Sequence, residues 1–597
     1  SYRVRHAERL CAALNAPARA EMMQLLRQPF SFGALAMRAE YLKVPNAKEF
    51  LSAVLADAQI EPNATAKEGY WSDHWTYLLD LIESYTAIFP EKEKMLLFDD
   101  ATYRWFSGGF AVRGQSERYC IIGNGLRQYR CCNTVQRNAK WVLTADGKTA
   151  ESTLAEKLLL LCAVKFATLD ISGAAVEMEG GKPGWNDALN GLPGLLGSGV
   201  SEGCALLRLL EYLLDRQQLF PLHIEVFAEI AELLRADAAL TDARLSKAEK
   251  WLRRNAVREN YRKAVSDGFS GIRTALAREE LSTVLYTMSA DLRCAITAET
   301  AENGGICPTY FYYRILQWQT EPQGILPKQA EKVTLPLFLE GPMRWLQTKQ
   351  PLEEKRRMAH AVKESPLFDQ KLKMYRLNAN LEQTTYEIGR IRAFPRGWLE
   401  NESIWLHMEY KYLLSLLQAG LYEEFFEDFA NAVIPFLPPD TYKRSTLEGS
   451  SFLLSSANPD AASHGRGYVA RLSGSTAEMV SLWNTMFFGP APFSAGETGL
   501  QLRFCPAVPK RLIAGREYIS GTFLGHTCVI YHLGSLRELL PKQYHIVEYR
   551  LDNAVTICAS ALPPMWSERI RAGRVKQIDV YFKQEDDNGT EAVYHNV

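Results

Sequence analysis

The stretch from residue 179 to residue 201 constrains the chain most, because it holds seven glycines and two prolines. So many helix breakers exclude a helix interior and predict a fixed loop. Within it, Trp185, Asn186 and Asp187 place an indole, an amide and a carboxylate side by side. Sugar rings stack on indole, and a neighbouring acid can protonate a glycosidic oxygen. The stretch therefore indicates a sugar-cleaving site; the alternative is a structural turn in which Asp187 caps the next helix.

Length and charge limit the class of protein. The chain has 597 residues, 47% of them hydrophobic, which is enough for roughly two or three domains with large cores. Its 68 basic residues balance 69 acidic ones, so the net charge favours neither nucleic acid nor an anionic membrane as a partner. No apolar run in the sequence is long enough to span a bilayer and no signal-peptide pattern opens the chain, so we expect a soluble protein.

The cysteine pattern indicates the compartment. Eleven cysteines, an odd number, show no recurrent spacing, and Cys131 and Cys132 are adjacent. This pattern suits reduced thiols better than disulfides or zinc, and predicts a cytoplasmic protein. The histidines and carboxylates also lack the spacing of metal ligands, and no glycine-rich nucleotide motif follows a predicted strand. We therefore expect neither a metal nor a nucleotide cofactor.

Hydrophobic periodicity divides the chain into parts. Residues 1–60 predict a helical lead-in or linker, and residues 61–490, with apolar residues at helical spacing, predict a large catalytic domain of helices. Within it, residues 225–300 are highly charged, and their interleaved Glu and Asp favour an exposed helical insertion over a basic RNA-binding helix. Residues 491–597 alternate apolar and polar side chains between turns, and predict a C-terminal β-sandwich.

Several elements are predicted individually. Residues 206–214 predict one helix, and residues 410–437 predict two helices on either side of Ala419 and Gly420. Strands are predicted at 527–531, 545–551 and 575–582. Many helices followed by strands predict a mainly α fold class, with a helical barrel as the largest domain.

A second group of polar and aromatic residues lies at residues 398–407. Within ten residues it combines two indoles, two carboxylates, an amide and an imidazole, from Trp398, Glu400, Asn401, Glu402, Trp405 and His407. A surface helix rarely begins with so many aromatic residues, so we interpret the group as part of a substrate site. The alternative is structural, with the carboxylates complementing a helix N-terminus and His407 serving as a core histidine.

Two further stretches carry polar groups. Residues 463–477 combine hydroxyls and glycines with His464 and Arg471 ahead of a predicted helix, which suits an oxyanion such as phosphate. The alternative is a glycine-rich turn with a Ser or Thr N-cap. Trp71 and Asp73 precede another predicted helix, and indicate a sugar subsite.

Taken together, these motifs resemble those of the (α/α)6-barrel glycoside phosphorylases, the cellobiose phosphorylase family (glycoside hydrolase family 94) and its larger relatives that act on β-1,3-oligoglucans. In that family a Trp-Asn-Asp loop supplies the general acid, which implies Asp187 for that role. The family also has an Asn-Gly-Gly stretch and, four residues later, a phosphate-binding His. Asn401 and His407 keep that spacing, while Glu402 and Ser403 replace the two glycines.

The same resemblance extends to the phosphate loop. The family's Leu-Thr-Gly-Thr-Ala sequence is similar to residues 472–477, which implies phosphate contacts from Ser473 and Gly474. Chemistry alone adds Arg471 and His464 as candidates. The resemblance covers about residues 60–560 and implies an (α/α)6 barrel, a homodimer and no cofactor beyond inorganic phosphate as co-substrate.

The reaction implied is inverting phosphorolysis of a β-linked gluco-oligosaccharide to α-glucose 1-phosphate. We favour β-1,3-oligoglucans, because the loops depart from the pattern of the smaller enzymes. An inverting β-glucan hydrolase stays open, with Asp187 as acid and Glu402 or Glu448 as base. A non-catalytic carbohydrate-binding or scaffold protein stays open as well. The expected partners are thus oligosaccharide and phosphate, and neither nucleic acid nor membrane.

Overall fold

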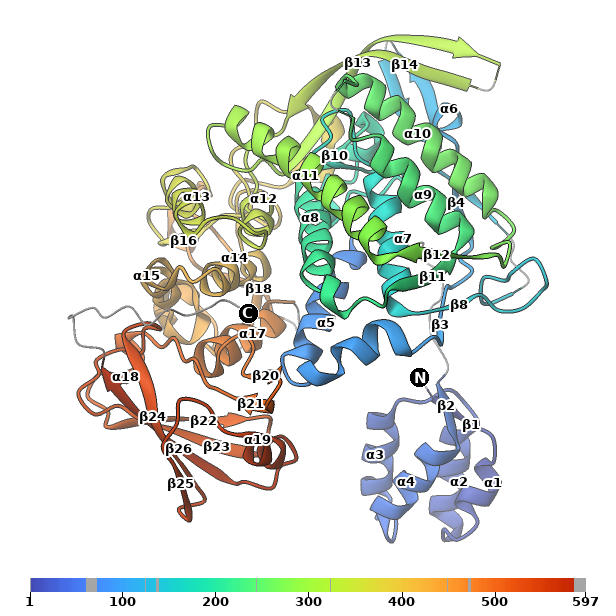
Figure 1. Ribbon diagram of the computed structural model, residues 1–597. Helices are drawn as coiled ribbons and strands as arrows, with labels where there is room; N and C mark the ends of the chain where they lie inside the picture. The colour runs from blue at the N-terminus through green and yellow to red at the C-terminus, as the bar shows by residue number, and fades with distance from the viewer. Residues whose placement is uncertain are drawn as a thin grey trace. The chain divides into compact units, whose positions relative to one another are not determined.

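The structure is a computed structural model of the whole chain. It describes residues 2–60, 72–123, 125–135, 139–242, 244–322, 324–447, 449–470 and 474–584. The chain divides into two compact units, Ser1–Tyr70 and Trp71–Val597, which are described separately. Figure 1 labels their helices and strands.

In the first unit, short helices pack around a small core. Its elements are β1 (Tyr2–Val4), α1 (Ala7–Cys11), α2 (Ala16–Leu26), α3 (Phe32–Tyr41), α4 (Ala47–Asp57) and β2 (Ala58–Ile60), with β1 and β2 antiparallel. Asn15 caps the N-terminus of α2 and Ser31 caps that of α3, because each side chain accepts a hydrogen bond from the backbone N–H three residues later. Met22, Leu35 and Val54 are fully buried among these helices, so the segment has a core of its own.

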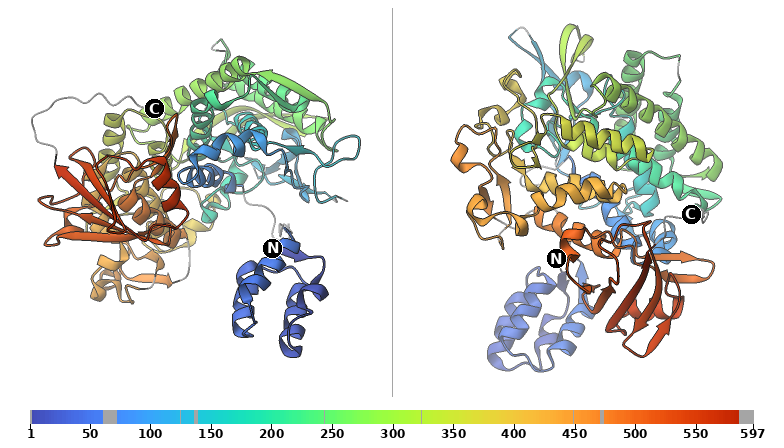
Figure 2. Two further views of the ribbon diagram at one scale, coloured as in Figure 1. Left: turned by 60° about the horizontal axis from the view of Figure 1, so that its bottom comes forward. Right: turned by 90° about the vertical axis from the view of Figure 1, so that its left-hand side faces the viewer.

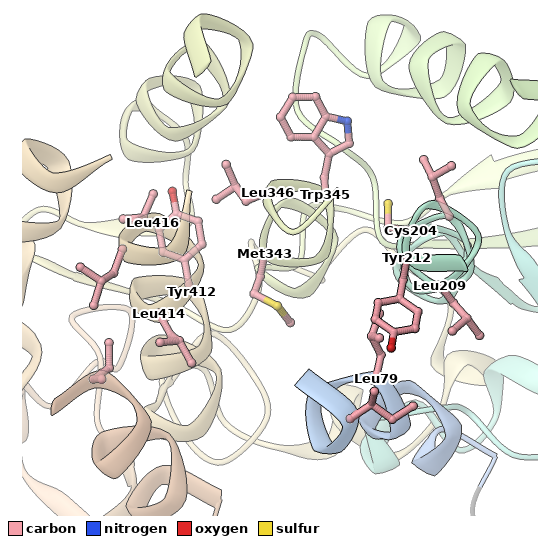
Figure 3. Packing of buried hydrophobic residues seen from close by; sticks show 14 of the residues in the cluster. Leu79, Cys204, Leu209, Tyr212, Met343, Trp345, Leu346, Tyr412, Leu414 and Leu416 are labelled. Atoms are coloured by element: carbon pink, nitrogen blue, oxygen red, sulfur yellow. The ribbon is translucent and has the colours of Figure 1, made fainter. Parts of the chain in front are cut away.

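Helices of the second unit share one large apolar core. They include α5 (Leu78–Thr86), α7 (Leu154–Phe166), α8 (Val200–Asp215), α9 (Ala228–Ala239), α10 (Lys247–Ala264), α11 (Arg278–Glu302), α12 (Glu340–Leu346), α13 (Leu352–Glu364), α14 (Leu406–Gln418), α15 (Tyr422–Ala432) and α17 (Gly474–Phe488). Figure 3 shows part of the core, where Leu79 from α5, Leu209 from α8 and Met343 from α12 lie among the helices.

Small antiparallel sheets lie between these helices. The largest has the order β14-β13-β10-β9, and its long strands β13 (Tyr310–Glu321) and β14 (Gly324–Thr334) pair with the short strands β10 (Ser198–Gly199) and β9 (Val176–Glu177). The pairs are β3 (Tyr103–Arg104) with β8 (Glu151–Ser152), β4 (Phe110–Val112) with β7 (Cys132–Thr134), β5 (Tyr119–Ile122) with β6 (Gly125–Gln128), β11 (His223–Phe227) with β12 (Arg273–Ala277), and β15 (Phe368–Asp369) with β16 (Met374–Tyr375). A sheet of three strands joins β17 (Ile404–Trp405), β18 (Ser450–Leu453) and β19 (Gly467–Ala470).

The predicted mainly α class with an (α/α)6 barrel is wrong. The structure is 44% helix and 23% strand, and the helices of the described residues do not close into a barrel. The strands at residues 310–334 account for part of the error. Residues Tyr310–Tyr313 are four consecutive aromatic side chains of high strand propensity, whereas the prediction followed the helical stripes on either side.

The helices predicted as an exposed insertion, at residues 225–300, are part of the core instead. Helices α9 and α11 supply buried apolar side chains to it, and Arg254 and Arg258 of α10 are each 1% exposed. Arg254 donates to Asp291 at 2.9 Å, and Arg258 lies 3.1 Å from Glu179. The local charge pattern was misleading because one of these partners, Glu179, lies far away in the sequence.

The C-terminal part is one sheet rather than the predicted β-sandwich. Strands β22 (Tyr518–Phe523), β23 (Thr527–His532), β24 (Tyr544–Leu551), β25 (Val555–Ile557) and β26 (Gln577–Gln584) lie in the order β22-β23-β26-β24-β25. Figure 2 shows this C-terminal sheet in red from two further directions. Strands β23 and β26 are parallel. The chain between them runs through β24, β25 and helix α19 (Pro564–Arg571), which is long enough for the crossover that a parallel pair needs. A separate hairpin of β20 (Phe493–Gly496) and β21 (Gly499–Leu502) precedes this sheet.

Over the described ranges, no helix is both long and apolar enough to cross a bilayer.

Candidate functional site

The glycine-rich loop presents Asp187 at a short 3-10 turn (Asp187–Leu189). The turn is capped by Asn186, whose side-chain oxygen accepts the Ala188 N–H at 3.2 Å. Helix α8 begins at Val200 without a side-chain cap. Asp187 therefore caps neither the turn nor the helix, and its half-buried carboxyl is left for other contacts. Asn186 is 1% exposed, and its Nδ2 has no hydrogen-bond partner among the described residues.

Burial and nearby charges perturb the Asp187 carboxyl. Burial raises its pKa, Arg390 and Lys182 oppose the shift, and the negative charge of Asp73 adds to it. The Glu400 carboxyl is perturbed in the same way. Burial raises its pKa, the charge of Arg390 lowers it, and the charge of Asp187 raises it further. The two carboxyl groups therefore interact with each other and with the same guanidinium. A raised pKa suits a general acid, which must hold its proton near neutral pH.

The beginning of this loop is held by a buried ion cluster. Glu179, the first residue of the stretch, contacts Arg118 at 2.6 Å, Arg258 at 3.1 Å and Arg262. Burial alone would raise the pKa of Glu179, but the three guanidinium groups hold it well below its usual value. Arg118 precedes β5, and the other two arginines lie on α10.

Aromatic rings connect the loop to the second predicted group. The Trp185 and Trp405 rings lie 4.4 Å apart between centroids, and Trp185 lies 5.5 Å from His407. Trp405 also contacts Phe452, at 4.9 Å. Because Trp405 ends β17 and His407 lies in the first turn of α14, the strand-to-helix junction carries both rings to the loop. The structure thus brings together residues more than 200 positions apart in the sequence.

His407 fills the space left by the missing side chain of Gly474. A Cβ at Gly474 would lie only 2.2 to 2.4 Å from three ring atoms of His407. Gly474 begins the 15-residue helix α17, so the imidazole lies at a helix N-terminus. Backbone N–H groups and the helix dipole favour an anion at such a position.

Two buried cations lie near this helix end. Lys411 is 6% exposed and Arg344 is 3% exposed, and their charged groups lie 4.8 and 5.9 Å from the ring centroid of Tyr77. Lys411 contacts Glu478 at 2.8 Å, and His407 lies 3.6 Å from the same carboxylate. Sequence reasoning missed both cations. Lys411 could have been found, because it lies four residues after His407 on one helix face; Arg344 has no comparable signal.

The protonation states of this cluster are set by burial and by the cations. Burial lowers the pKa of His407, with Lys411 and Arg344 acting in the same direction and Glu478 opposing. Burial would raise the pKa of Glu478, but His407 and Lys411 lower it to about 2. Near neutral pH the imidazole is therefore neutral and Glu478 is charged. A neutral ring can still donate one hydrogen bond to an anion.

Asp73 lies in the same region as a buried acceptor. It is 7% exposed, and its Oδ1 has no hydrogen-bond partner among the described residues. Its charge raises the pKa of Glu202 and Glu340, after the larger effect of burial in each case. Glu202 accepts a hydrogen bond from Trp75 Nε1 at 3.2 Å and faces Gly184 of the glycine-rich loop at residues 179–201, here called the acid loop. An unpaired buried acceptor suits a substrate hydroxyl, because leaving it unpaired costs free energy.

Other predicted residues have structural contacts. Asn401 donates to the Phe394 carbonyl at 2.8 Å. Trp398 packs edge-on against Tyr468 at 4.4 Å. The ring nitrogens of His464 contact Lys371 and the Asn458 carbonyl, each at 2.7 Å, so neither nitrogen is left for phosphate. Four predicted residues, Trp71, Glu448, Arg471 and Ser473, lie outside the described residues.

Glu402 is held in an ion pair. Arg396 donates to its two oxygens at 2.5 and 3.0 Å, and the Glu402 side chain is only 2% exposed. We expect Glu402→Gln to lower stability by roughly 1–3 kcal/mol, because the buried carboxylate loses its charge-assisted hydrogen bonds to the partly exposed Arg396. Turnover per folded molecule should stay the same. Thermal unfolding and activity, measured on one preparation, check both expectations.

A matched control is Glu382→Gln, since the exposed Glu382 carboxylate lies 3.8 Å from the same guanidinium. Neither stability nor turnover should change in that variant. A loss of turnover of roughly a hundredfold in Glu402→Gln with unchanged stability would instead restore Glu402 as a catalytic base.

Comparisons with known proteins do not add a family. No protein-family model matches this sequence, and no curated protein matches it either. In the part of the chain that the structure describes, no cluster of three or more His, Cys, Asp or Glu could hold a metal ion. The site is therefore defined by its own geometry: a perturbed acid, an aromatic wall, and a helix N-terminus flanked by buried cations.

Proposed function

We propose that this chain is an inverting glycoside phosphorylase that cleaves β-linked gluco-oligosaccharides, with β-1,3-linked glucans as the favoured substrates. One observation carries the proposal. The ring of Trp185, two residues before Asp187, lies 5.5 Å from His407, whose ring lies against Gly474 at the start of α17. These contacts support a site in which the proposed proton donor and the helix end act together, as phosphorolysis needs.

In the proposed reaction, Asp187 gives its proton to the glycosidic oxygen as the bond from that oxygen to the anomeric carbon breaks. An oxygen of inorganic phosphate forms the new bond from the opposite face, which gives α-glucose 1-phosphate and a shortened sugar. The charge on phosphate is offset by Lys411 and Arg344 and by the dipole of α17. Phosphate is already a nucleophile, so no catalytic base is required.

The proposed acid predicts the pH dependence. Asp187 is active only when protonated, and burial raises its pKa. We expect kcat/KM to fall on the alkaline side as the pH rises through this pKa. A pH profile of kcat/KM under substrate-limited conditions measures it. If the alkaline limb is the same after Asp187 is replaced, the group that titrates there is not Asp187.

An inverting hydrolase is the second candidate, because Asp187 interacts with a neighbouring carboxyl. Glu400 is that neighbour, and it would activate water on the opposite face of the sugar. Both oxygens of Glu402 accept hydrogen bonds from Arg396, so Glu402 is not favoured as the base of a hydrolase. Glu400→Gln should abolish a hydrolase, while a phosphorylase should lose mainly sugar affinity.

The deciding experiment runs the reaction in reverse. The protein is incubated with α-glucose 1-phosphate and with glucose, cellobiose or laminaribiose as acceptor, and released phosphate is measured. Release of phosphate with laminaribiose supports a β-1,3-specific phosphorylase. Release with cellobiose would replace β-1,3 by β-1,4 as the proposed linkage of the substrate. No release with any acceptor, together with phosphate-independent cleavage of β-glucans, would replace the proposal by the hydrolase.

We also propose a reducing compartment such as the cytoplasm. No disulfide joins any of the eleven cysteines, all of which lie in described parts of the chain. The sulfur atoms of the buried pair Cys204 and Cys307 are 4.0 Å apart, well beyond the ~2 Å of a disulfide bond.

A further inference from the structure

Residues 386–393 lie directly against the acid loop. The N–H of Gly191 donates to the Ile388 carbonyl at 3.1 Å, and the N–H of Arg390 donates to Asn190 Oδ1 at 3.0 Å. The two backbones approach so closely that a Cβ at Gly191 would lie 2.1 Å from the Glu387 carbonyl. The path of this segment is therefore fixed relative to the loop that carries Asp187.

Strand β6 contacts both segments through neighbouring side chains. Gln128 donates to the carbonyls of Met178 and Pro193 at 3.2 and 3.1 Å, which holds the acid loop. Arg127 donates to both oxygens of Glu387, from Nε at 2.6 Å and from Nη2 at 2.9 Å. Such bidentate ion pairs have a defined geometry. One strand thus fixes the acid loop and residues 386–393 together.

Arg390 follows Glu387 by three residues and is the charged group that this segment brings to the site. Its guanidinium acts on Asp187 and on Glu400. The other charged groups that act on Asp187 are Lys182, within the loop, and Asp73, which precedes α5. The carboxyl group of Glu400 also interacts with Asp187.

We propose that the Arg127–Glu387 ion pair positions Arg390 beside Asp187, and so sets the pH range over which Asp187 can donate its proton. Arg127 and Glu387 are positioning residues, because they act through Arg390. The proposal rests on the proposed function in one respect, that Asp187 is the acid.

The sign of the effect separates positioning from direct electrostatics. A nearby cation favours the charged form of Asp187, so displacing Arg390 raises the pKa of Asp187 and moves the alkaline limb of kcat/KM to higher pH. Removing the negative charge of Glu387 without any movement would do the opposite, because it leaves Asp187 in a more positive field. Glu387→Gln therefore shifts the limb upward only if Arg390 moves.

The test compares pH profiles of kcat/KM for four proteins. We expect Arg390→Gln to move the alkaline limb up by roughly one pH unit, and Glu387→Gln to move it in the same direction by less. The reversed pair, Arg127→Glu with Glu387→Arg, should restore the wild-type limb. An unchanged or lowered limb in Glu387→Gln, or no restoration by the reversed pair, would overturn the proposal.

A matched control is available on another surface. Arg235 and Glu280 form a pair at 2.7 Å, with side chains 45% and 37% exposed, and neither belongs to the site. The Glu280→Gln variant should keep the wild-type limb. Thermal unfolding of all variants checks the fold, and an exposed pair contributes at most about 1 kcal/mol.

A readout without turnover separates this proposal from the proposed function. Carbodiimide modifies protonated carboxyl groups, and mass spectrometry follows the modification of Asp187 as a function of pH. If the wild type turns over no sugar with phosphate or water, the proposed function fails. The modification midpoint must still move up in Arg390→Gln and Glu387→Gln; a fixed midpoint overturns the positioning role.

Discussion

Replacing Asp187 by Asn is expected to lower kcat/KM for an unactivated oligosaccharide by roughly 10²–10⁴-fold, the usual contribution of a general acid. Asn has nearly the same size, so the turn that Asn186 caps should persist. The Asp187 carboxyl has no hydrogen bond in the described structure that its loss would break. Initial rates with phosphate and a β-linked oligosaccharide give the effect, and thermal unfolding shows whether the fold is intact.

A substrate that needs no proton separates acid catalysis from other roles. Dinitrophenyl β-glucoside releases a stable phenolate, so Asp187→Asn should retain most of its activity on it. Asp460→Asn is a matched control: Asp460 is an exposed residue that caps a short turn by accepting the Ala462 N–H at 3.2 Å. It should behave as the wild type. Equal losses on both substrates would contradict the role of Asp187 as acid.

Gly474→Ala is expected to raise the KM for phosphate by roughly tenfold or more. The added methyl group overlaps the imidazole of His407, so the ring must leave the N-terminus of α17. Loss of one hydrogen bond to a charged ligand costs about 1.5–3 kcal/mol, and 1.4 kcal/mol corresponds to a factor of ten in affinity. Initial rates at varied phosphate and saturating sugar measure the change.

Two further variants make this result interpretable. His407→Ala should raise the KM for phosphate to a similar degree, and the double variant should add little, because both changes remove the same contact. Gly496→Ala is the control, since no atom lies within 4 Å of a Cβ there. If phosphate dependence is unchanged in both Gly474→Ala and His407→Ala, the phosphate site lies elsewhere.

Local patterns predicted individual elements well. The stripe at residues 206–214 is confirmed as part of α8, and residues 410–437 hold most of α14 and all of α15. The turn between these two helices is at Ala419 and Gly420, where Gly420 has a φ of 78°, a conformation that glycine adopts without strain. Predicted strands near 527, 545 and 575 correspond to β23, β24 and β26. These features depend on neighbours in sequence, so the sequence displays them.

The arrangement of elements depends on distant partners and was predicted poorly. Arg254 and Arg258 resemble surface residues in sequence, yet both are buried, and Arg258 is paired with Glu179. Nothing in the sequence around Arg344 indicates a role in the candidate site, because only the packing of α12 against α14 brings it there. For the site itself, the motifs and the family resemblance single out Trp185, Trp405, His407 and Gly474, and the structure brings these residues into contact. Chemistry alone predicts a phosphate contact for His464, whereas its ring nitrogens contact Lys371 and the Asn458 carbonyl.

The ion cluster at Glu179 has a consequence for engineering. One carboxylate, at the first residue of the acid loop, pairs with the buried Arg118 and Arg258 and with the partly exposed Arg262. A library that varies this position would leave these cations without that counter-ion. Such members would be lost at the expression step, before any selection for new substrates. Lys182, which lies in the same loop, is only partly buried, and is the position where diversity should be introduced first.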